Sequence, residues 1–386
     1  MDFATPFDIN TAINLGLLGI LLAILGGIIT TRSLLAAILL MSVYSLVSVV
    51  WLVIMDAVDV AFTEAVVGAG ISTIVLLGAI LLTRSEALHI KWQDVIGPAA
   101  AVLATGALLL YAAIDLPALG DPSSPANAYV GRLYIEHTPH EIGVPNIVTA
   151  VLSSYRGFDT LGETTVIFAA GIAVTIMLGF GERSLSDLPA DVRAPNFDNL
   201  AESDHHVILR VAAKMLAPVT ILYALYVQFH GDLGAGGGFQ AGVVVAVAVI
   251  LHALVFGLRD TMHAIRPEVT RGVSAVGVLI YAGVGVIGML NGGVFLDYDH
   301  LFPVAFESGL PGSHLSGGHH HWGQHFGIMF IELGVLATVS STLITVFYAF
   351  AGRSSDAEVD IHAAHAPPAA DAPMRASGAA KGGAGA

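Results

Sequence analysis

The chain has 386 residues, of which 55% are hydrophobic and only 12% charged, and its mean hydropathy is +0.78. Soluble globular domains carry about a quarter of their residues as Asp, Glu, Lys or Arg, so a water-facing globular surface, a disordered chain and a collagen-like fibre are excluded for the protein as a whole. The net charge of −15 argues against nucleic-acid binding, and the lack of cysteine excludes disulfides and thiol chemistry.

Nine stretches of the sequence are long and apolar enough to cross a bilayer as helices, which takes about 17–25 residues each. The composition and these stretches together predict an all-α integral membrane protein with about nine transmembrane helices. The stretches cover about residues 12–30, 33–55, 60–83, 95–114, 163–181, 214–230, 237–258, 270–292 and 326–351.

The basic residues indicate how these spans are oriented. With the N-terminus outside and the C-terminus in the cytoplasm, 13 of the 15 Lys and Arg residues fall in inner loops or the tail. Only Arg132 and Arg156 then fall outside. Because positive charge favours the cytoplasmic side, this orientation supports nine spans.

Loop lengths divide the chain into modules. We expect a three-helix module over 1–90, a two-helix module with a long outer loop over 91–185, a polar cytoplasmic linker over 186–209 and a four-helix module over 210–352. The tail over 353–386 is rich in Ala, Pro and Gly, has little apolar surface to bury and is expected to be disordered.

Three glutamates within the predicted spans are candidates for function, because a carboxylate at the centre of a bilayer costs about 2.5–3.5 kcal/mol on insertion scales. Glu332 has either a functional role or a structural hydrogen bond to a neighbouring helix. Glu64 is alternatively an interfacial residue that reaches headgroup water. Thr160 and Glu163 have the spacing of a capping box at a helix start, which is a structural interpretation of Glu163. In the predicted orientation all three lie toward the outside.

Lys214 is the one lysine at the end of a predicted span, and Pro218 follows one turn later. Proline has no amide hydrogen, so the carbonyl of Lys214 loses its helical partner and is available to water or a cation. A simple kink is the more common outcome of such a proline.

The turn between the sixth and seventh spans, FHGDLGAGGGFQAG, has the most unusual composition in the chain. Its glycines permit positive φ and close approach of other backbone segments. A nucleotide phosphate loop is not favoured, since no Lys-Ser/Thr follows. We expect an outer hairpin that packs against a partner or folds partly back into the bilayer. Its candidate residues are His230, Asp232, Gly236, Gly237 and Gly238.

The outer loop before the ninth span holds a histidine run, His319–His321, with His300, His314 and His325 nearby. Such a run can bind a divalent metal, but consecutive imidazoles more often form a solvated, pH-sensitive loop, so no dedicated metal site is predicted. The sequence shows no catalytic triad, zinc motif or Walker signature. We therefore expect neither enzymatic activity nor a cofactor.

Three strings resemble known families. DVAFTEAVVGAGIS, at 59–72, resembles the D subunit of membrane-bound hydrogenases and the matching C-terminal part of the A subunit of Mrp-type cation/proton antiporters. PNIVTA at 145–150, followed by RGFDTLGE at 156–163, is similar to the neighbouring E-type module. The region 210–352 is similar to the Mrp antiporter B subunit. There the usual HGHLSPGGGF is HGDLGAGGGF, and Glu332 stands where an aspartate is frequent.

The resemblance implies that one polypeptide combines D-, E- and B-type modules. It further implies a transporter subunit of an Mrp-like cation/proton antiporter in a bacterial inner membrane, assembled with large pump subunits and small accessory subunits. It favours ion-path roles, for Na⁺ and H⁺, for Glu64, Glu163 and Glu332, and places Asp159 in the same motif. Lys214 is the one candidate for an intramembrane lysine of the pump type. Two alternatives remain open, namely a scaffold subunit of a redox-driven complex related to complex I or to the hydrogenases, and a stand-alone carrier.

Overall fold

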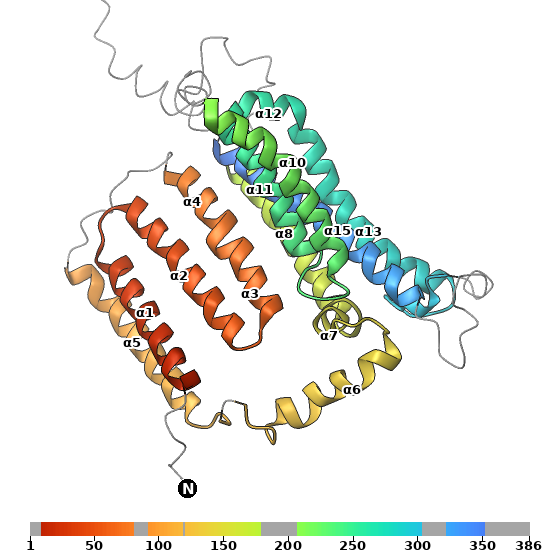
Figure 1. Ribbon diagram of the computed structural model, residues 1–386, viewed down its shortest axis with the longest axis horizontal. Coiled ribbons are helices and arrows are strands. Elements are labelled where there is room, and N and C mark those ends of the chain that lie inside the picture. The colour runs from red at the N-terminus through yellow and green to blue at the C-terminus, as the bar shows by residue number, and fades with distance from the viewer. Residues whose placement is uncertain (1–8, 81–91, 119, 179–206, 303–321, 352–386) are drawn as a thin grey trace, which may run out of the picture.

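The computed structural model describes residues 9–80, 92–118, 120–178, 207–302 and 322–351. Within these ranges it contains helices and no strands, and nine helices are long and apolar enough to cross a membrane, which confirms the predicted fold class (Figure 1). The N-terminal part of the chain contains α1 (Ile9–Thr30), α2 (Leu34–Ile54) and α5 (Trp92–Ala113). The rest of the chain contains α8 (Gly157–Leu178), α10 (Val207–His230), α11 (Gly238–Phe256), α13 (Pro267–Leu290) and α15 (Trp322–Ala351).

The third span is continuous but not uniform. It begins as α3 (Val58–Glu64), widens into a π-helical segment η1 (Ala65–Ile71) and returns to an α-helix in α4 (Ser72–Ile80). The hydroxyl of Ser42 on α2 donates to the carbonyl of Ala69 at 3.3 Å, which provides a partner from outside the helix. π-Helical turns inside helices are frequently found at functional sites, and this one starts directly after Glu64.

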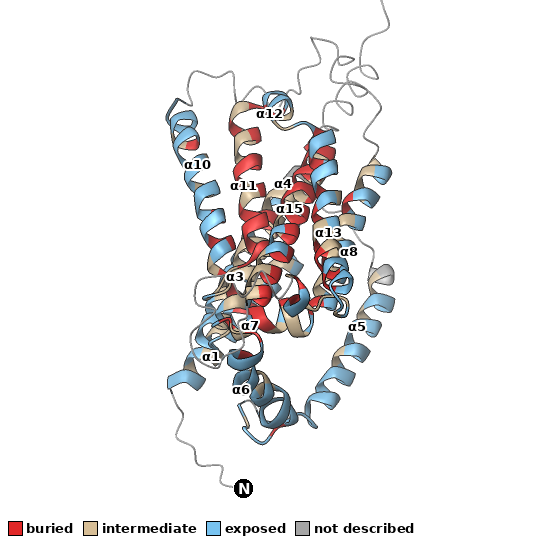
Figure 2. Ribbon diagram, turned by 90° about the vertical axis from the view of Figure 1, so that its right-hand side faces the viewer, coloured by how far each residue is buried: buried red, intermediate tan, exposed pale blue. Residues whose placement is uncertain are grey.

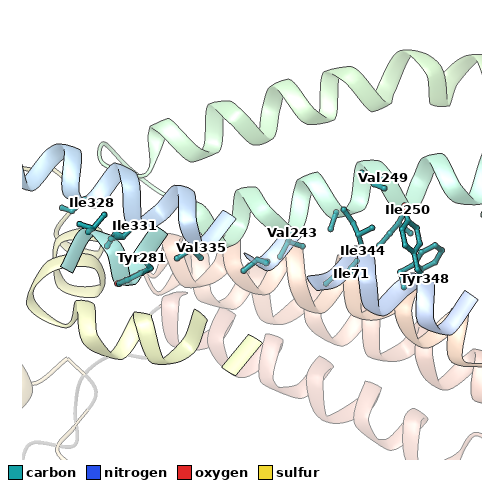
Figure 3. Close-up of a cluster of buried hydrophobic side chains, with 14 of the residues drawn as sticks. Ile71, Val243, Val249, Ile250, Tyr281, Ile328, Ile331, Val335, Ile344 and Tyr348 are labelled. Atoms are coloured by element: carbon teal, nitrogen blue, oxygen red, sulfur yellow. The ribbon is translucent and has the colours of Figure 1, made fainter. Parts of the chain in front are cut away.

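The core of the bundle is the surface where α15 packs against α11, α13 and α8. Figure 3 shows its apolar side chains in a row along α15, with Ile71 of η1 reaching in from the third span. Of the most hydrophobic window, 67% of the residues are buried in α15 and 61% in α11, but only 6% in α1 and in α2. The peripheral helices therefore present apolar side chains outward, as lipid-facing helices do.

α5 stands apart from the other spans. No residue of its most hydrophobic window is buried, and Figure 2 shows it as a separate rod to one side of the bundle. In a membrane, the space beside it is filled by lipid or by helices of another chain.

The segment between α5 and α8 was predicted as a long loop over about 115–162, and this prediction is wrong in part. It forms η2 (Ala126–Gly131), α6 (Arg132–Glu141), α7 (Ile147–Ala150) and the π-helical η3 (Val151–Tyr155), all at one end of the bundle. We call this the turn end, because the glycine-rich turn between α10 and α11 lies there. The opposite end carries α12 (Leu258–Ala264) and is called the α12 end.

A side-chain contact holds α6 against η3 at the turn end. The Tyr155 hydroxyl donates to Glu141 Oε2 at 2.6 Å, and the Nδ1 of His137 lies 3.0 Å from Oε1. These contacts lower the pKa of Glu141, the Tyr155 bond having the larger effect. Burial, followed by the same bond, raises the pKa of Tyr155 to about 12. The pair keeps the helical connection docked on the bundle.

Close approach of α13 and α15 depends on Gly277. A Cβ at this position would collide with the Thr338 side chain and the Gly334 carbonyl of α15, whereas a Cβ at Gly283 of the same helix meets nothing within 4 Å. We expect Gly277→Ala to lower the thermal midpoint of the purified protein, because overpacking a core typically costs about 1–3 kcal/mol. Gly283→Ala serves as the control and should be neutral or stabilising, since alanine favours helix by about 1 kcal/mol. Equal midpoints for the two variants would contradict this packing.

Several predicted segments lie outside the described residues. These are the linker over 186–206, the tail over 353–386 and the histidines His314 and His319–His321.

Candidate functional site: a carboxylate cavity where three segments meet

The glycine-rich turn is shaped by contact with α15. Gly237 has φ of +119°, which L side chains rarely adopt, and its amide donates to the carbonyl of Val227 at 3.1 Å. Gly238, the first residue of α11, lies so close to α15 that a Cβ there would collide with the carbonyl oxygen of Glu332. The predicted hairpin thus folds onto helices of its own chain. Glycine is needed here because the backbone of one segment touches the backbone of another.

Asn146 fastens the same turn to the rest of the protein. Its Oδ1 accepts from the amides of Val148 and Thr149 at 3.0 and 3.4 Å, which caps the start of α7. Its Nδ2 lies 2.8 Å from the carbonyl of Gly234, 3.1 Å from that of Gly231 and 3.2 Å from Asp59 Oδ1. A single amide therefore joins α3, α7 and the turn.

Two further hydrogen bonds support this junction. The Thr149 hydroxyl donates to the Gly231 carbonyl at 2.7 Å, and the side-chain amide of Gln240 on α11 donates to the Thr63 hydroxyl on α3 at 2.7 Å. Together with Asn146, they bring segments from residues 59 to 240 to one place, so the site exists only in the folded chain.

A cavity of about 310 Å³ lies at this junction. Three of its lining side chains are carboxylates from three different helices: Asp59 of α3, Glu163 of α8 and Glu332 of α15. The other polar lining side chains are Thr63, Thr149, Ser153, Thr160, Thr164 and Gln240, and the remaining lining residues are Val60, Val148, Leu152, Ile167, Gly236, Gly237, Gly238, Phe239 and Val335.

Glu332 is the most buried of the three carboxylates, with 8% of the residue exposed. Its Oε atoms lie against Gly231 and Gly237, and its carboxyl group interacts electrostatically with Asp232. Among the described residues, no Lys, Arg or His forms an ion pair with Glu332 or Glu163. A buried carboxylate without a basic partner holds a proton or a bound cation, because an isolated buried charge is too costly.

The three carboxylates line the cavity without forming one cluster. Within the parts of the chain that the structure describes, no three His, Asp or Glu side chains are grouped closely enough to hold one metal ion. Glu163 is exposed on the surface of α8, so the cavity opens sideways there. Carboxylates placed in this way offer separate groups that can each bind a proton or a cation.

Of the predicted ion-path residues, the structure brings Glu163 and Glu332 together in the cavity and places the others elsewhere. Glu64 points toward α2, where a side chain at Gly68 would collide with its carboxyl group and with the hydroxyl of Ser45. Asp159 is exposed and ion-paired with Arg156 at 2.6 Å.

Lys214 lies far from the cavity along α10. Its ammonium is at the α12 end, 5.7 Å from the centre of the Phe256 ring. Arg210 approaches the same ring at 5.8 Å.

The predicted turn residues all lie at the turn end. Gly236, Gly237 and Gly238 line the cavity. His230 stacks on Tyr226 with ring centres 5.0 Å apart. Asp232 lies 3.5 Å from Nδ1 of His325, which stands on α15 seven residues before Glu332. The pair forms the polar edge of the site nearest to Glu332.

The capping-box interpretation of Thr160 and Glu163 is wrong. α8 begins at Gly157, so Glu163 lies nearly two turns inside the helix, and the Thr160 hydroxyl donates to the carbonyl of Leu152 at 2.7 Å. Sequence reasoning also missed Asp59 and Asn146. Both lie in the strings that carry the family resemblance, but neither lies within a predicted span. A polar residue is a candidate because burial in the bilayer is costly, and this argument applies only inside a span.

Comparison with family models matches three parts of the chain in order. Residues 19–85 match the D subunit of MBH, and residues 95–183 match the E subunit of MBH. Residues 208–345 match a domain related to the MnhB subunit of Na⁺/H⁺ antiporters. The cavity is lined by residues from all three matched regions.

Similar proteins bear antiporter names. A probable K⁺/H⁺ antiporter A/B subunit of Rhizobium meliloti is 26% identical over 299 residues, which is 72% of this chain and 28% of that protein. A putative antiporter subunit mnhB2 of Staphylococcus haemolyticus is 28% identical over 39% of this chain and 99% of its own length. An uncharacterised Methanocaldococcus jannaschii protein is 28% identical over 43% of this chain and 63% of its own. This chain thus spans only part of its larger relatives.

The fold also has a solved counterpart. The structure of the Mrp complex from Dietzia sp. DQ12-45-1b contains a chain that matches with a TM-score of 0.67 and 23% identity, over 91% of this chain and 36% of that one. The likeness extends over both the peripheral and the central helices. In one polypeptide, three successive regions are thus similar to the D subunit of MBH, the E subunit of MBH and a domain related to the MnhB subunit of Na⁺/H⁺ antiporters.

Proposed function

We propose that this protein is a membrane subunit of a multi-subunit Mrp-like cation/proton antiporter, in which the carboxylate cavity is part of the path for H⁺ and for Na⁺ or another alkali cation. The observation that carries the proposal is the meeting of Asp59, Glu163 and Glu332 in one cavity at the junction of all three matched regions. Separately placed carboxylates on membrane helices, one of them the buried Glu332, bind and release protons or cations in exchange. The names of the relatives, K⁺/H⁺ and Na⁺/H⁺ antiporter subunits, support the same activity.

Other membrane subunits are the partners in this proposal. Glu163 is exposed on a membrane-spanning helix, which is unfavourable unless a neighbouring chain covers it. Gly16, Gly19 and Gly26 on α1 meet nothing within 4 Å, so their small-residue face is open to another helix. The separate position of α5 leaves further space for partner helices.

The proposed location is a bacterial inner membrane, with the turn end outside and the α12 end in the cytoplasm. Five basic residues support this orientation by gathering toward the α12 end, namely Arg210, Lys214, Arg259, Arg266 and Arg271. We also propose that the modules over 1–90, 91–185 and 210–352 act as three units of assembly, with 186–209 as linker and 353–386 as tail.

A scaffold subunit of a redox-driven complex is the second candidate, and the matches to two MBH subunits favour it. Purification of the tagged protein from its native membrane separates the two. Antiporter-type subunits without redox proteins support the antiporter, while iron–sulfur or flavin subunits in the same particle support the redox-driven complex.

The cavity itself is tested by neutralising two of its carboxylates. We expect Glu163→Gln combined with Asp59→Asn to abolish Na⁺- or K⁺-dependent proton movement in everted vesicles that contain the assembled complex. Asp159→Asn is the matched control, since Asp159 lies one turn from Glu163 on α8 but outside the cavity, and it should keep wild-type exchange. Exchange that persists in the assembled double variant would reject the cavity as the path.

A further inference from the structure

A second cavity, of about 180 Å³, lies on the same seam between α8 and α15, nearer to the α12 end. Its polar lining comes from three helices: Thr175 of α8, Arg271 and Ser274 of α13, and Thr342 and Thr345 of α15. Among its described lining residues none is acidic. We call it the hydroxyl pocket.

The hydroxyls of this pocket are arranged in pairs across the α13–α15 interface. Ser274 Oγ lies 2.7 Å from Thr342 Oγ1, and one turn closer to the α12 end Thr345 Oγ1 lies 2.7 Å from Thr270 Oγ1. All four residues are at most 5% exposed. Hydroxyls both donate and accept, so the direction of the Ser274–Thr342 bond can reverse, whereas Thr345 donates to Thr270 and Thr270 donates to the Pro267 carbonyl.

The two cavities follow one another along α8 and α15. The carboxylate cavity reaches as far as Ile167 on α8 and Val335 on α15, and the hydroxyl pocket begins at Phe168 and Gly171 on α8 and at Thr342 on α15. At a rise of about 1.5 Å per residue, Ile167 to Gly171 is about 6 Å and Val335 to Thr342 about 10 Å. The hydroxyl pocket therefore follows the carboxylate cavity along the α8–α15 interface, on the side toward the α12 end.

Burial of hydroxyls between membrane helices can be purely structural, because interhelical hydrogen bonds hold such helices together. Pairs that serve only this purpose need no adjoining space. Here Ser274, Thr342 and Thr345 also line a cavity that has room for several waters, each of which takes about 30 Å³. Open space for water beside buried hydroxyls, one pair of which can reverse its hydrogen bond, is what a proton path requires.

The charges of the pocket favour a proton over a metal cation. Arg271 is half-exposed at its rim, with its guanidinium 3.6 Å from Glu268, and no carboxylate lines the interior to compensate a bound Na⁺ or K⁺. A proton moves by exchange of hydrogen bonds along hydroxyls and water, one entering as another leaves, so no ion has to shed its hydration shell.

We propose that the hydroxyl pocket is the proton-selective half of the path, where Ser274, Thr342 and Thr345 relay protons through bound water between the α12 end and the carboxylate cavity. This proposal rests on the proposed antiporter function and adds a second site with a separate role. Cations use the carboxylate cavity, while protons also use the pocket.

The test compares hydroxyl-free and hydroxyl-retaining variants in everted vesicles, with initial exchange rates divided by the amount of assembled complex. The double variant Ser274→Ala/Thr342→Val should be about 10²-fold slower, the lower end of what a positioned proton-transferring group contributes. Its KM for the cation should stay unchanged, and Thr342→Ser, which keeps the hydroxyl, should stay near the wild-type rate. Ser340→Ala is the control, since this buried α15 hydroxyl bonds only to the Ala337 carbonyl of its own helix.

Two results would overturn the relay: a double variant as fast as Ser340→Ala, or a changed cation KM with an unchanged maximal rate. The Glu163→Gln/Asp59→Asn variant separates this proposal from the proposed function. If that variant is inactive while the hydroxyl variant is active, the relay alone fails. If both keep exchange, the carboxylate path fails as well.

Discussion

Replacing Glu332 by glutamine is expected to stop cation/proton exchange while leaving the protein folded. The glutamine side chain has the same shape and fits against Gly231 and Gly237, but it neither takes up a proton nor balances a cation. Because an uncharged amide costs less to bury than a carboxylate, folding should not suffer. The loss should be at least about 10²-fold in exchange rate, as for other groups that transfer protons at a site. The measurement is exchange in everted vesicles at equal amounts of complex.

Glu332→Asp provides the matched control. It keeps the carboxyl group but withdraws it from the glycine turn, so partial exchange should remain. If Glu332→Gln and Glu332→Asp lose exchange to the same extent, geometry rather than charge would be the function of Glu332. If Glu332→Gln retains full exchange, Glu332 would only connect helices.

Replacing Asn146 by alanine should have the largest effect on assembly. The substitution removes the cap of α7, worth about 1 kcal/mol. It also removes the hydrogen bond to the partly buried carbonyl of Gly234, and a typical hydrogen bond contributes about 0.5–1.5 kcal/mol. The junction of α3, α7 and the turn would then open. The expected result is a lower thermal midpoint and loss of full-length protein from the purified complex.

Asn146→Asp separates the two roles of this residue. Aspartate still caps α7, but its carboxylate would face the Gly231 and Gly234 carbonyls and Asp59, which now accept from the amide. It should therefore destabilise as strongly as alanine. Asn127→Ala is the control, because the Asn127 amide bonds the Asp121 carbonyl in an exposed turn. An Asn146→Asp protein as stable as wild type would show that only the cap matters.

The sequence by itself determined the fold class, the nine spans and the family that each region resembles. Hydrophobicity summed over some twenty residues depends little on what packs beside a helix. The glycine turn and the other family-like motifs are short continuous stretches, so they can be recognised without knowing the fold. The boundaries were less secure. α8 begins six residues before the predicted start, because Gly157 is held by a hydrogen bond from Tyr281 to its carbonyl at 2.7 Å, a contact made from α13.

Tertiary structure decided which carboxylates line the same cavity. Thr63 and Glu64 are neighbours in sequence, yet successive helical residues point about 100° apart, so Thr63 lines the cavity and Glu64 faces α2. The packing of α3 on α2 and α11 determines which of these two side chains faces the cavity. Asp59 and Asn146 gained their roles in the same way, because their partners are 85 or more residues away in the chain. A site assembled from such distant segments is determined by packing, which local sequence patterns do not contain.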